Sequence, residues 1–477
     1  MKVMAQVFGL ALLYCALIAC SKPSSDRDWP KPNSQTPKEY NDTSEECRDF
    51  VDALPSDWVR GFITVNENAN DPKSPQLRIF YYGRWLEGQT PTLFINGGPT
   101  SDSHGDYRVM TNTGLAAAAW SHAPILFFDQ RGNGCSSKYP QGNSSEILAR
   151  LKYYGSTAIV NDAEAIRKSL FGDKPWSIFG QSYGAWVVHR YVTLYPYSVK
   201  NAFAHANAIT VEPIQRLADR VMAQNRVLNT YFGQYPDDQK RLETLRRFLT
   251  PSTCYPILAK SNQRCGYGAI QTLVTRMAFV PRWPWIHSWL KTIVVINDNS
   301  ITYDPNAMSD FVRKNAFSQV VDSSNNKYWA QLIIDRYDRD VPSFDRHTCE
   351  SIYDILRSRG EQPESYLLHE CMTAMQYSAD ENFLKDRDLR LKAFEAANGN
   401  DHLTIDSFRS ALLQKAQTFF YLYAGLLDNM VPVENFEYEI SKVSALVHYR
   451  RFATSGHDGF YTEPQIARDV LGLSILK

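Results

Sequence analysis

The sequence lacks an excess of charge of either sign. Lys and Arg together number 51, and Asp and Glu together number 51, so the formal net charge at pH 7 is zero. No long run of like charges occurs either. A protein that binds nucleic acid by neutralising phosphates needs a clustered basic surface, so we exclude nucleic acid as a partner.

Metal-binding patterns are missing as well. No CxxC pair occurs, and His369-Glu370 is followed by Thr373 where a zinc-binding HExxH helix needs histidine. The usual sequence signatures of structural zinc and of zinc proteases are therefore absent. We expect no metal and no cofactor.

What the sequence has is an ordinary globular balance with many aromatic residues. Of its 477 residues, 44% are hydrophobic, 21% charged and 13% aromatic. A chain of this length buries about three quarters of its unfolded surface and allows two or three structural units. No internal repeat is evident. These features exclude disorder as the main state and predict aromatic pockets.

The N-terminus is predicted to be an export signal, residues 1–19. Lys2 is followed by an apolar stretch that ends at Cys20 and a polar Ser21. The stretch resembles a bacterial lipoprotein box, which implies that Cys20 is the first mature residue and is lipidated, each buried methylene adding about 0.8 kcal/mol of membrane affinity. Ser21 follows the cysteine in place of the aspartate that would resemble an inner-membrane retention signal, which favours the outer membrane. An ordinary secretory signal and an uncleaved membrane span are the alternatives.

Residues 20–44 contain four prolines among polar residues and are predicted to be a tether. An exported chain meets an oxidising compartment, so the remaining six cysteines are candidates for disulfides, although sequence alone does not fix their connectivity. Proximity suggests Cys254 with Cys265 and Cys349 with Cys371, which leaves Cys47 and Cys135.

Apolar runs bounded by Gly, Pro or polar turns recur along the chain and are typical of strands. Several are apolar on both faces, as strands inside a covered parallel sheet are. Helical periodicity lies between them, for example over residues 162–170 and 185–194. The alternation predicts an α/β sheet. The expected strands are residues 77–82, 92–95, 125–128, 176–179, 201–204, 419–424 and 446–452.

The pattern changes between these strands, over residues 211–415. This segment has helical periodicity, a charged stretch at 241–247 and a tryptophan cluster around Trp285. We interpret it as a mainly helical cap, called the insertion below. It would divide an α/β core into a first part, residues 45–210, and a second part, residues 416–477.

A nucleophile elbow is predicted at Gly180-Gln181-Ser182-Tyr183-Gly184. Its two glycines would allow a sharp strand-to-helix turn that holds Ser182 in strained geometry, where a Cβ would clash. The helix that follows directs its N-terminal N–H groups at the serine. A plain turn serine is the alternative, but the strand before and the helix after favour a nucleophile.

A glycine loop, Asn96-Gly97-Gly98-Pro99-Thr100, follows the predicted strand 92–95. The oxyanion of acyl transfer needs two preorganised N–H donors, and we assign the backbone amides of Gly98 and Tyr183 to this role. Taken alone, Gly-Gly-Pro is more often a plain turn. Its position upstream of the elbow favours the oxyanion hole.

A third motif, Asp129-Gln130-Arg131-Gly132-Asn133-Gly134-Cys135-Ser136, completes a trio. The trio resembles the prolyl aminopeptidase family of α/β-hydrolase serine peptidases and its secreted tripeptidyl aminopeptidase relatives, whose segments read like HGGPG, DQRGxGxS and GGSWG or GGSYG. The resemblance covers residues 47–210 and 419–477. It implies an α/β-hydrolase fold, in which a mostly parallel sheet is covered by helices, with a large helical cap before the last strands.

The acid and the base of a triad are expected downstream of Ser182, in that order. Asp428 lies in a segment similar to the family's G-x-x-D-x-x-x-P acid loop, and His457 lies in one similar to its G-H loop. We therefore predict the triad Ser182, Asp428 and His457. Glu434 and Asp458 are the competing acids.

Two departures bear on the substrate, because Asn96 and Thr100 replace the family's His and final Gly. In the relatives, carboxylates of the cap bind the free amine of a peptide, and Glu370 is one candidate here, with a solvated helix carboxylate as the alternative. We expect an aminopeptidase that releases proline or short N-terminal peptides through an acyl-enzyme. A carboxylesterase on the same triad and a non-catalytic binding lipoprotein with this fold are the alternatives.

Overall fold

The computed structural model describes residues 44–112, 117–142, 144–209, 213–249, 254–256, 263–265, 273–297, 300–315, 326–339, 346–360, 381–415 and 419–472. Residues 1–43, which include the predicted signal, Cys20 and all but the last residue of the predicted tether, lie outside these residues, as do the candidate Glu370 and Cys371.

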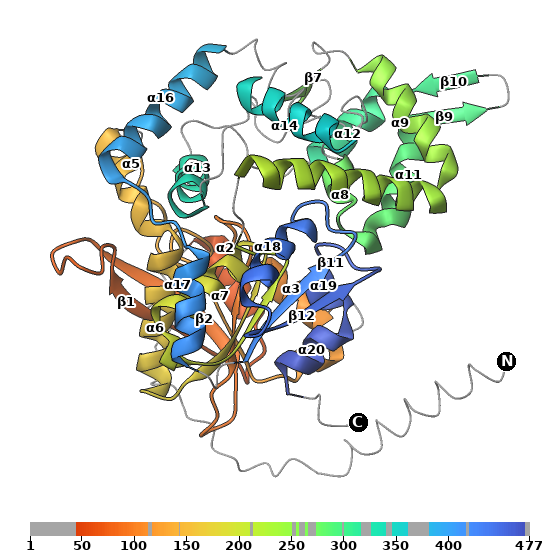
Figure 1. The fold of residues 1–477 in the computed structure, drawn as a ribbon. Coiled ribbons are helices and arrows are strands. Elements are labelled where there is room, and N and C mark those ends of the chain that lie inside the picture. The colour runs from red at the N-terminus through yellow and green to blue at the C-terminus, as the bar shows by residue number, and fades with distance from the viewer. Residues whose placement is uncertain are drawn as a thin grey trace, which may run out of the picture.

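An eight-stranded sheet forms the centre of the molecule, with strand order β1-β2-β4-β3-β5-β6-β11-β12 (Figure 1). β1 and β2 pair antiparallel, as do β2 and β4, and every later pair in the order is parallel. The strands are β1 (Val59–Asn66), β2 (Gln76–Arg84), β3 (Thr92–Ile95), β4 (Ile125–Phe128), β5 (Trp176–Gln181), β6 (Val199–His205), β11 (Phe419–Gly425) and β12 (Val447–Phe452).

All seven predicted strands are confirmed, because each overlaps a strand of this sheet. Every residue of β3 and β4 is buried, which explains their uninterrupted apolar sequences. β1, the edge strand, was not predicted, and it is only partly buried toward its end. The architecture is the α/β-hydrolase arrangement that the sequence predicted.

Helices cover both faces of the sheet and form two apolar cores. One core includes side chains of α6 (Ser156–Phe171), α7 (Tyr183–Leu194), α17 (Ile405–Gln414) and α18 (Glu434–Val443). The opposite core includes side chains of α2 (Glu45–Asp52), α3 (His104–Asn112), α4 (Ala117–Ser121), α19 (Gly459–Thr462) and α20 (Pro464–Val470).

Helix α6 begins at Ser156, six residues before the start that was expected at Asp162. The predicted start of this helix at Asp162 was therefore wrong. Asp162 is buried in the middle of the helix, where its two carboxylate oxygens accept hydrogen bonds from the Arg131 guanidinium at 2.6 and 2.7 Å. Its charge is paired with the DQRG motif and does not cap the helix.

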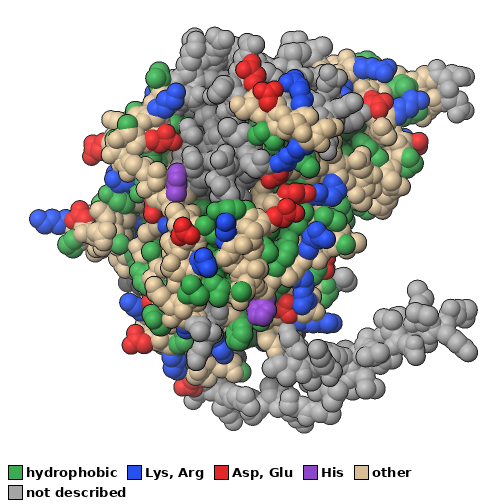
Figure 2. All heavy atoms as spheres, viewed as in Figure 1, with side chains coloured by type: hydrophobic (Ala, Val, Ile, Leu, Met, Phe, Trp, Pro, Cys, Tyr) green, Lys and Arg blue, Asp and Glu red, His purple; other side chains and the backbone are tan. Residues whose placement is uncertain are grey.

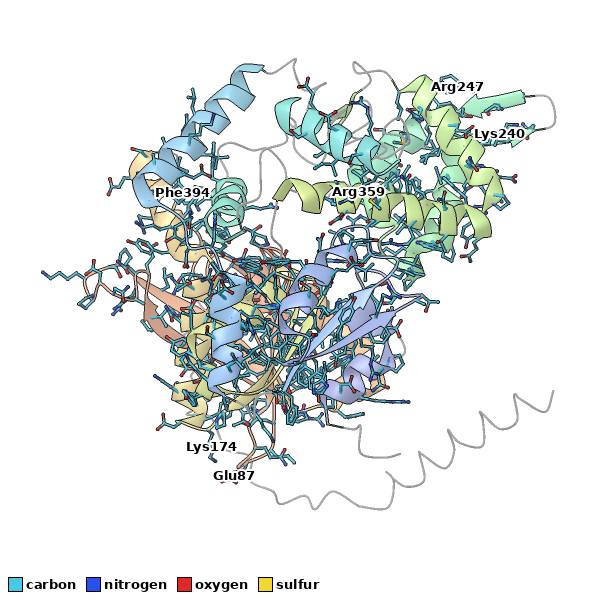
Figure 3. The ribbon with its side chains drawn as sticks, in the orientation of Figure 1. Glu87, Lys174, Lys240, Arg247, Arg359 and Phe394 are labelled. Carbon is cyan, nitrogen blue, oxygen red and sulfur yellow. A yellow bond between two sulfur atoms is a disulfide. The ribbon has the colours of Figure 1, made fainter. Side chains whose placement is uncertain are left out.

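The insertion lies beyond the carboxyl ends of the parallel strands. Figure 3 labels Glu87 and Lys174, which precede β3 and β5, at the far end of the sheet from Arg359 and Phe394 of the insertion. The described helices of the insertion, besides α17, are α8 (Pro213–Gln234), α9 (Pro236–Phe248), α11 (Trp283–Ile293), α12 (Pro305–Asn315), α13 (Asn326–Arg339), α14 (Arg346–Ser358) and α16 (Glu381–Asn398).

Side chains of α8, α9, α11 and α12 build a third apolar core, which Leu427 of the second core part joins. Two short hairpins were not foreseen: β7 (Cys254–Pro256) with β8 (Gln263–Cys265), and β9 (Val294–Asn297) with β10 (Ser300–Tyr303). The last helix of the insertion, α17, packs against α7. The insertion is therefore in direct contact with the helix that follows the predicted nucleophile.

A disulfide joins Cys47 of α2 to Cys135. Cys47 and Cys135 are the two cysteines that remained after the other four were paired by proximity in the sequence, so this pairing is confirmed. The backbone also places residues 254 and 265 directly opposite each other in the β7–β8 ladder. Their disulfide and the one between Cys349 and Cys371 stay predictions.

No helix in the described part of the chain is long and apolar enough to cross a membrane. Positive and negative side chains are interspersed over the face drawn in Figure 2, as the balanced composition suggests.

Candidate active site

The turn between β5 and α7 holds Ser182 in strained backbone geometry. Its φ is 55° and its ψ is −121°, and among the described residues only Thr100 and Ala206 are further non-glycine residues with positive φ. A Cβ at Gly180 would lie 2.2 Å from the Gly184 carbonyl oxygen, and a Cβ at Gly184 would lie 2.0 Å from that of Ile95. Only glycine fits at these two positions, as the elbow motif requires.

His457 and Asp428 form a buried pair. His457 Nδ1 lies 2.7 Å from Asp428 Oδ2, and the Asp428 side chain has no exposed surface. The other oxygen, Oδ1, accepts hydrogen bonds from the backbone amides of Met430 and Val431 at 2.8 and 2.9 Å. The carboxylate is thereby fixed, so it can hold the imidazole in one tautomer and stabilise its charged form.

The elbow and the histidine loop are adjacent. Gln181 donates from Nε2 to the carbonyl oxygen of His457 at 3.1 Å, one residue before Ser182. The Ser182 amide donates to the carbonyl oxygen of His205. The His205 ring is buried, and the charges of His457 and Asp428 are close enough to affect its pKa. The structure thus brings the three predicted loops to one place, at the carboxyl end of the sheet.

The competing acids do not occupy the position beside His457 Nδ1. Glu434 instead accepts from the Arg226 guanidinium at 2.5 and 3.1 Å. Asp458 is fully buried, and neither of its carboxylate oxygens has a hydrogen-bond partner among the described residues. Of the candidate acids, Asp428 is the one that contacts the histidine.

The glycine loop lies against the serine. A Cβ at Gly97 would lie 3.2 Å from Ser182 Cβ. Asn96, the first departure from the family pattern, donates from Nδ2 to the Ser101 carbonyl oxygen at 2.7 Å and so ties the loop together. Thr100, the second departure, keeps a φ of 74°. Glycine can adopt such a conformation without strain, which gives a physical reason for the final Gly of the family pattern.

The third motif braces the segment after the glycine loop through Asp129. Asp129 Oδ1 accepts from the amide and the hydroxyl of Ser103 at 3.0 and 2.8 Å, while Oδ2 accepts from the Cys135 amide at 2.7 Å and lies 2.8 Å from His104 Nε2. Burial opposes ionisation of Asp129, but these hydrogen bonds outweigh it and lower its pKa.

His104, Asp129 and Cys135 are close enough together to hold a metal ion. However, the Cys135 sulfur is bonded to Cys47, and both oxygens of Asp129 already accept hydrogen bonds. The donor set is therefore a poor match for a metal in the oxidised protein. A cavity of about 270 Å³ opens beside the disulfide, and its lining does not include Ser182 or His457.

Three titratable groups near the histidine have shifted pKa values; of these, Asp106 and His205 were not predicted, and Asp458 was considered only as a competing acid. Burial and the neighbouring Asp102 raise the pKa of Asp106 to about 7, and burial raises that of Asp458 to about 7 as well. Burial also lowers the pKa of His205 to about 3, so this imidazole is neutral. Sequence offers no signal for such groups, because each depends on what the fold packs around it.

The insertion contacts the loops that carry His457 and Asp428. The Ala278 carbonyl oxygen accepts from the His457 amide at 2.8 Å, and the Val274 carbonyl oxygen accepts from Asn429 Nδ2 at 2.9 Å. Arg226 of α8 donates to the Leu426 carbonyl oxygen at 2.8 Å. The geometry of both loops therefore depends on the insertion.

A family model described as alpha/beta hydrolase fold matches residues 90–464. Three proteins named proline iminopeptidase are similar over parts of the chain. The one from Aeromonas sobria is 32% identical over 202 residues, covering 37% of this chain and 44% of that protein. The one from Aspergillus aculeatus is 30% identical over a stretch that covers 26% of this chain and 31% of that protein. The one from Thermoplasma volcanium is 31% identical over a stretch that covers 34% of this chain and 52% of that protein. The chain spans about half the length of these relatives or less.

Solved structures are similar at lower identity. A proline iminopeptidase-related protein from Thermus thermophilus matches with a TM-score of 0.36 and 13% identity, covering 87% of this chain and 98% of that one. An acetylester hydrolase from Corynebacterium glutamicum matches with a TM-score of 0.41 and 14% identity, covering 87% and 95%.

Proposed function

The chain belongs to the α/β hydrolase fold family, and on that premise we propose that it is a serine hydrolase that removes proline or short peptides from the N-terminus of peptide substrates. The observation that carries the proposal is the 2.7 Å contact between His457 Nδ1 and the fully buried Asp428, beside an elbow that holds Ser182 at positive φ.

In the proposed mechanism, Ser182 Oγ attacks the carbonyl carbon of the scissile bond while His457 Nε2 takes its proton. Asp428 stabilises the resulting imidazolium, and the amides of Gly98 and Tyr183 bind the oxyanion. His457 then gives the proton to the leaving amine, which leaves an acyl-enzyme. Water, activated by the same histidine, hydrolyses the ester and regenerates Ser182.

The preference for peptides rests on two observations. The named relatives are proline iminopeptidases, and the trio of motifs resembles that of the prolyl aminopeptidase family. In addition, Asp106 lies near the glycine loop and His457, where a carboxylate favours a substrate with a positively charged amine. Glu370 stays a second candidate for binding that amine.

A carboxylesterase is the second candidate, because ester and amide hydrolysis use the same triad. A panel of aminoacyl, dipeptidyl and tripeptidyl fluorogenic amides, assayed beside short-chain nitrophenyl esters, separates the two. We expect amide turnover that is lost when the same amides are N-acetylated and when Ser182→Ala is used. Turnover of esters alone would end the peptidase proposal, and no turnover with no fluorophosphonate labelling would favour a binding protein.

We also propose that the protein is exported and held to the bacterial cell envelope, by preference the outer membrane, through acyl chains on Cys20. The proposal rests on the sequence of residues 1–21. Mass spectrometry of the mature N-terminus tests it, with Cys20→Ser as the control. A diacylglyceryl-modified Cys20 supports the anchor, whereas an unmodified cysteine or cleavage at another site refutes it.

A further inference from the structure

The side chain of Tyr183 connects the elbow to the insertion. Tyr183 is the first residue of α7, directly after Ser182, and its ring is fully buried. Its hydroxyl donates to Asp338 Oδ2 at 2.7 Å. Asp338 lies on α13 of the insertion, 155 positions away along the chain. The residue assigned to the oxyanion hole is thus held from outside the α/β core.

The same carboxylate oxygen holds a second element of the core. Asp338 Oδ2 accepts from the Ser156 amide at 2.7 Å, at the N-terminus of α6. The residue before that helix is Gly155, which offers no capping side chain, and a Cβ there would lie 2.7 Å from Asp338 Oδ1. Gly155 therefore leaves room for a cap supplied by the insertion, and Asp338 fastens α6 and α7 to each other.

Burying this carboxylate is costly. Asp338 has no exposed surface, and burial raises its pKa although the nearby Arg190 favours the charged form. Its Oδ1 has no hydrogen-bond partner among the described residues. A buried carboxylate with an unpartnered oxygen opposes folding, so stability alone does not account for it.

We propose that Asp338 is a positioning residue, which acts through the Tyr183 hydroxyl to fix the first residue of α7 and hence the backbone N–H that receives the oxyanion. The inference rests on the proposed serine hydrolase function. Oxyanion donors work only at about 2.7–3.1 Å from the developing charge, so a small rotation of Tyr183 weakens transition-state binding more than substrate binding.

The test uses Tyr183→Phe, which removes the hydroxyl and leaves the backbone amide in place. We expect kcat and the rate of fluorophosphonate labelling to fall by about tenfold or more, with a much smaller change in KM. Tyr231→Phe is the matched control, because the Tyr231 hydroxyl donates to the buried Asp238 at 2.5 Å within the insertion. It should leave kcat and labelling near wild type.

Two variants of Asp338 distinguish hydrogen bonding from charge. Asp338→Asn keeps an oxygen that can accept from both the Tyr183 hydroxyl and the Ser156 amide, so we expect it to retain most of kcat. Asp338→Ala removes this acceptor, so its loss of kcat should equal or exceed that of Tyr183→Phe. Circular dichroism and thermal melts establish that each variant is folded at the assay temperature. The conservative variants Tyr183→Phe and Asp338→Asn keep the test valid if Asp338→Ala does not fold.

Wild-type kcat and labelling in Tyr183→Phe would overturn the proposal, as would an equal loss in Tyr231→Phe. A failure of the underlying function looks different. In that case the wild-type protein itself shows neither turnover nor labelling, whatever stands at positions 183 and 338.

Discussion

At the scale of residues, the proposed chemistry depends on how a few polar side chains are paired or left unpaired at the carboxyl end of the sheet. Asp428 is buried and both of its carboxylate oxygens are hydrogen-bonded, one to His457 and the other to two backbone amides. Asp458, the next residue after the histidine, is equally buried and has no partner among the described residues. These two buried carboxylates therefore differ in their hydrogen bonding.

The first prediction concerns Asp428. In Asp428→Asn the amide no longer enforces the tautomer that leaves His457 Nε2 free to take a proton, so kcat should fall by about ten-thousandfold with little change in KM. Steady-state kinetics on the best amide substrate measure the effect. Glu434→Gln, at a competing acid that pairs with Arg226, should keep most of the activity. The reverse ranking of the two variants would show that the acid is assigned to the wrong residue.

The second prediction concerns stability and pH. Because the pKa of Asp458 is raised to about 7 in the folded protein from 3.8, the folded state binds more protons than the unfolded state between these values. Asp458 therefore destabilises the fold as pH rises from 4 to 8, at about 1.4 kcal/mol for each unit of pKa difference.

Denaturant unfolding at pH 4 to 8 checks the effect. Asp458→Asn should lose less stability than wild type across this range, while a surface control, Asp173→Asn, should follow the wild-type curve. Parallel curves for wild type and Asp458→Asn would show that this carboxyl titrates at an ordinary pH.

At the scale of elements, the sequence predicted those features that depend on neighbouring residues along the chain. The apolar runs of β3 and β4 follow from burial of every residue in these strands, and the elbow follows from glycines at 180 and 184 that the backbone contacts require. The start of α6 was missed because its cap is Asp338, far away in the sequence, rather than a neighbouring Ser or Asp. The link between Tyr183 and the insertion was missed for the same reason.

The third prediction is at the elbow. A Cβ at Gly184 would lie 2.0 Å from the Ile95 carbonyl oxygen, so Gly184→Ala forces α7 away from β3. We expect a loss of stability of about 1–3 kcal/mol or more and a loss of fluorophosphonate labelling. Gly105→Ala is the control, because nothing lies near the added methyl on helix α3. Equal melting temperatures for the two variants would contradict the packing described here.

At the scale of the whole molecule, the insertion contacts the loops of the proposed active site directly. It contacts the loops of His457, Asp428 and Tyr183 from different elements. The sequence predicted an insertion from its altered periodicity, but its contacts with the core are long-range and left no local pattern. The Cys47–Cys135 disulfide is another long-range link, which joins α2 to the motif that braces the segment after the glycine loop.

The fourth prediction follows from that disulfide. It closes a loop of 88 positions, so its reduction should destabilise the protein by about 2–4 kcal/mol. Urea unfolding with and without dithiothreitol measures the difference. The Cys47→Ala/Cys135→Ala variant should begin less stable and respond less to the reductant. A shift of the same size in both proteins would mean that a different cysteine pair carries the effect.

The central claim is that Ser182 is an activated nucleophile, and covalent labelling tests it most directly. Intact-protein mass spectrometry after treatment with a fluorophosphonate, followed by peptide mapping, should find one adduct per chain, on Ser182, which forms far more slowly in Asp428→Asn. An unlabelled wild-type protein that is folded, or an adduct on a different serine, would contradict the account.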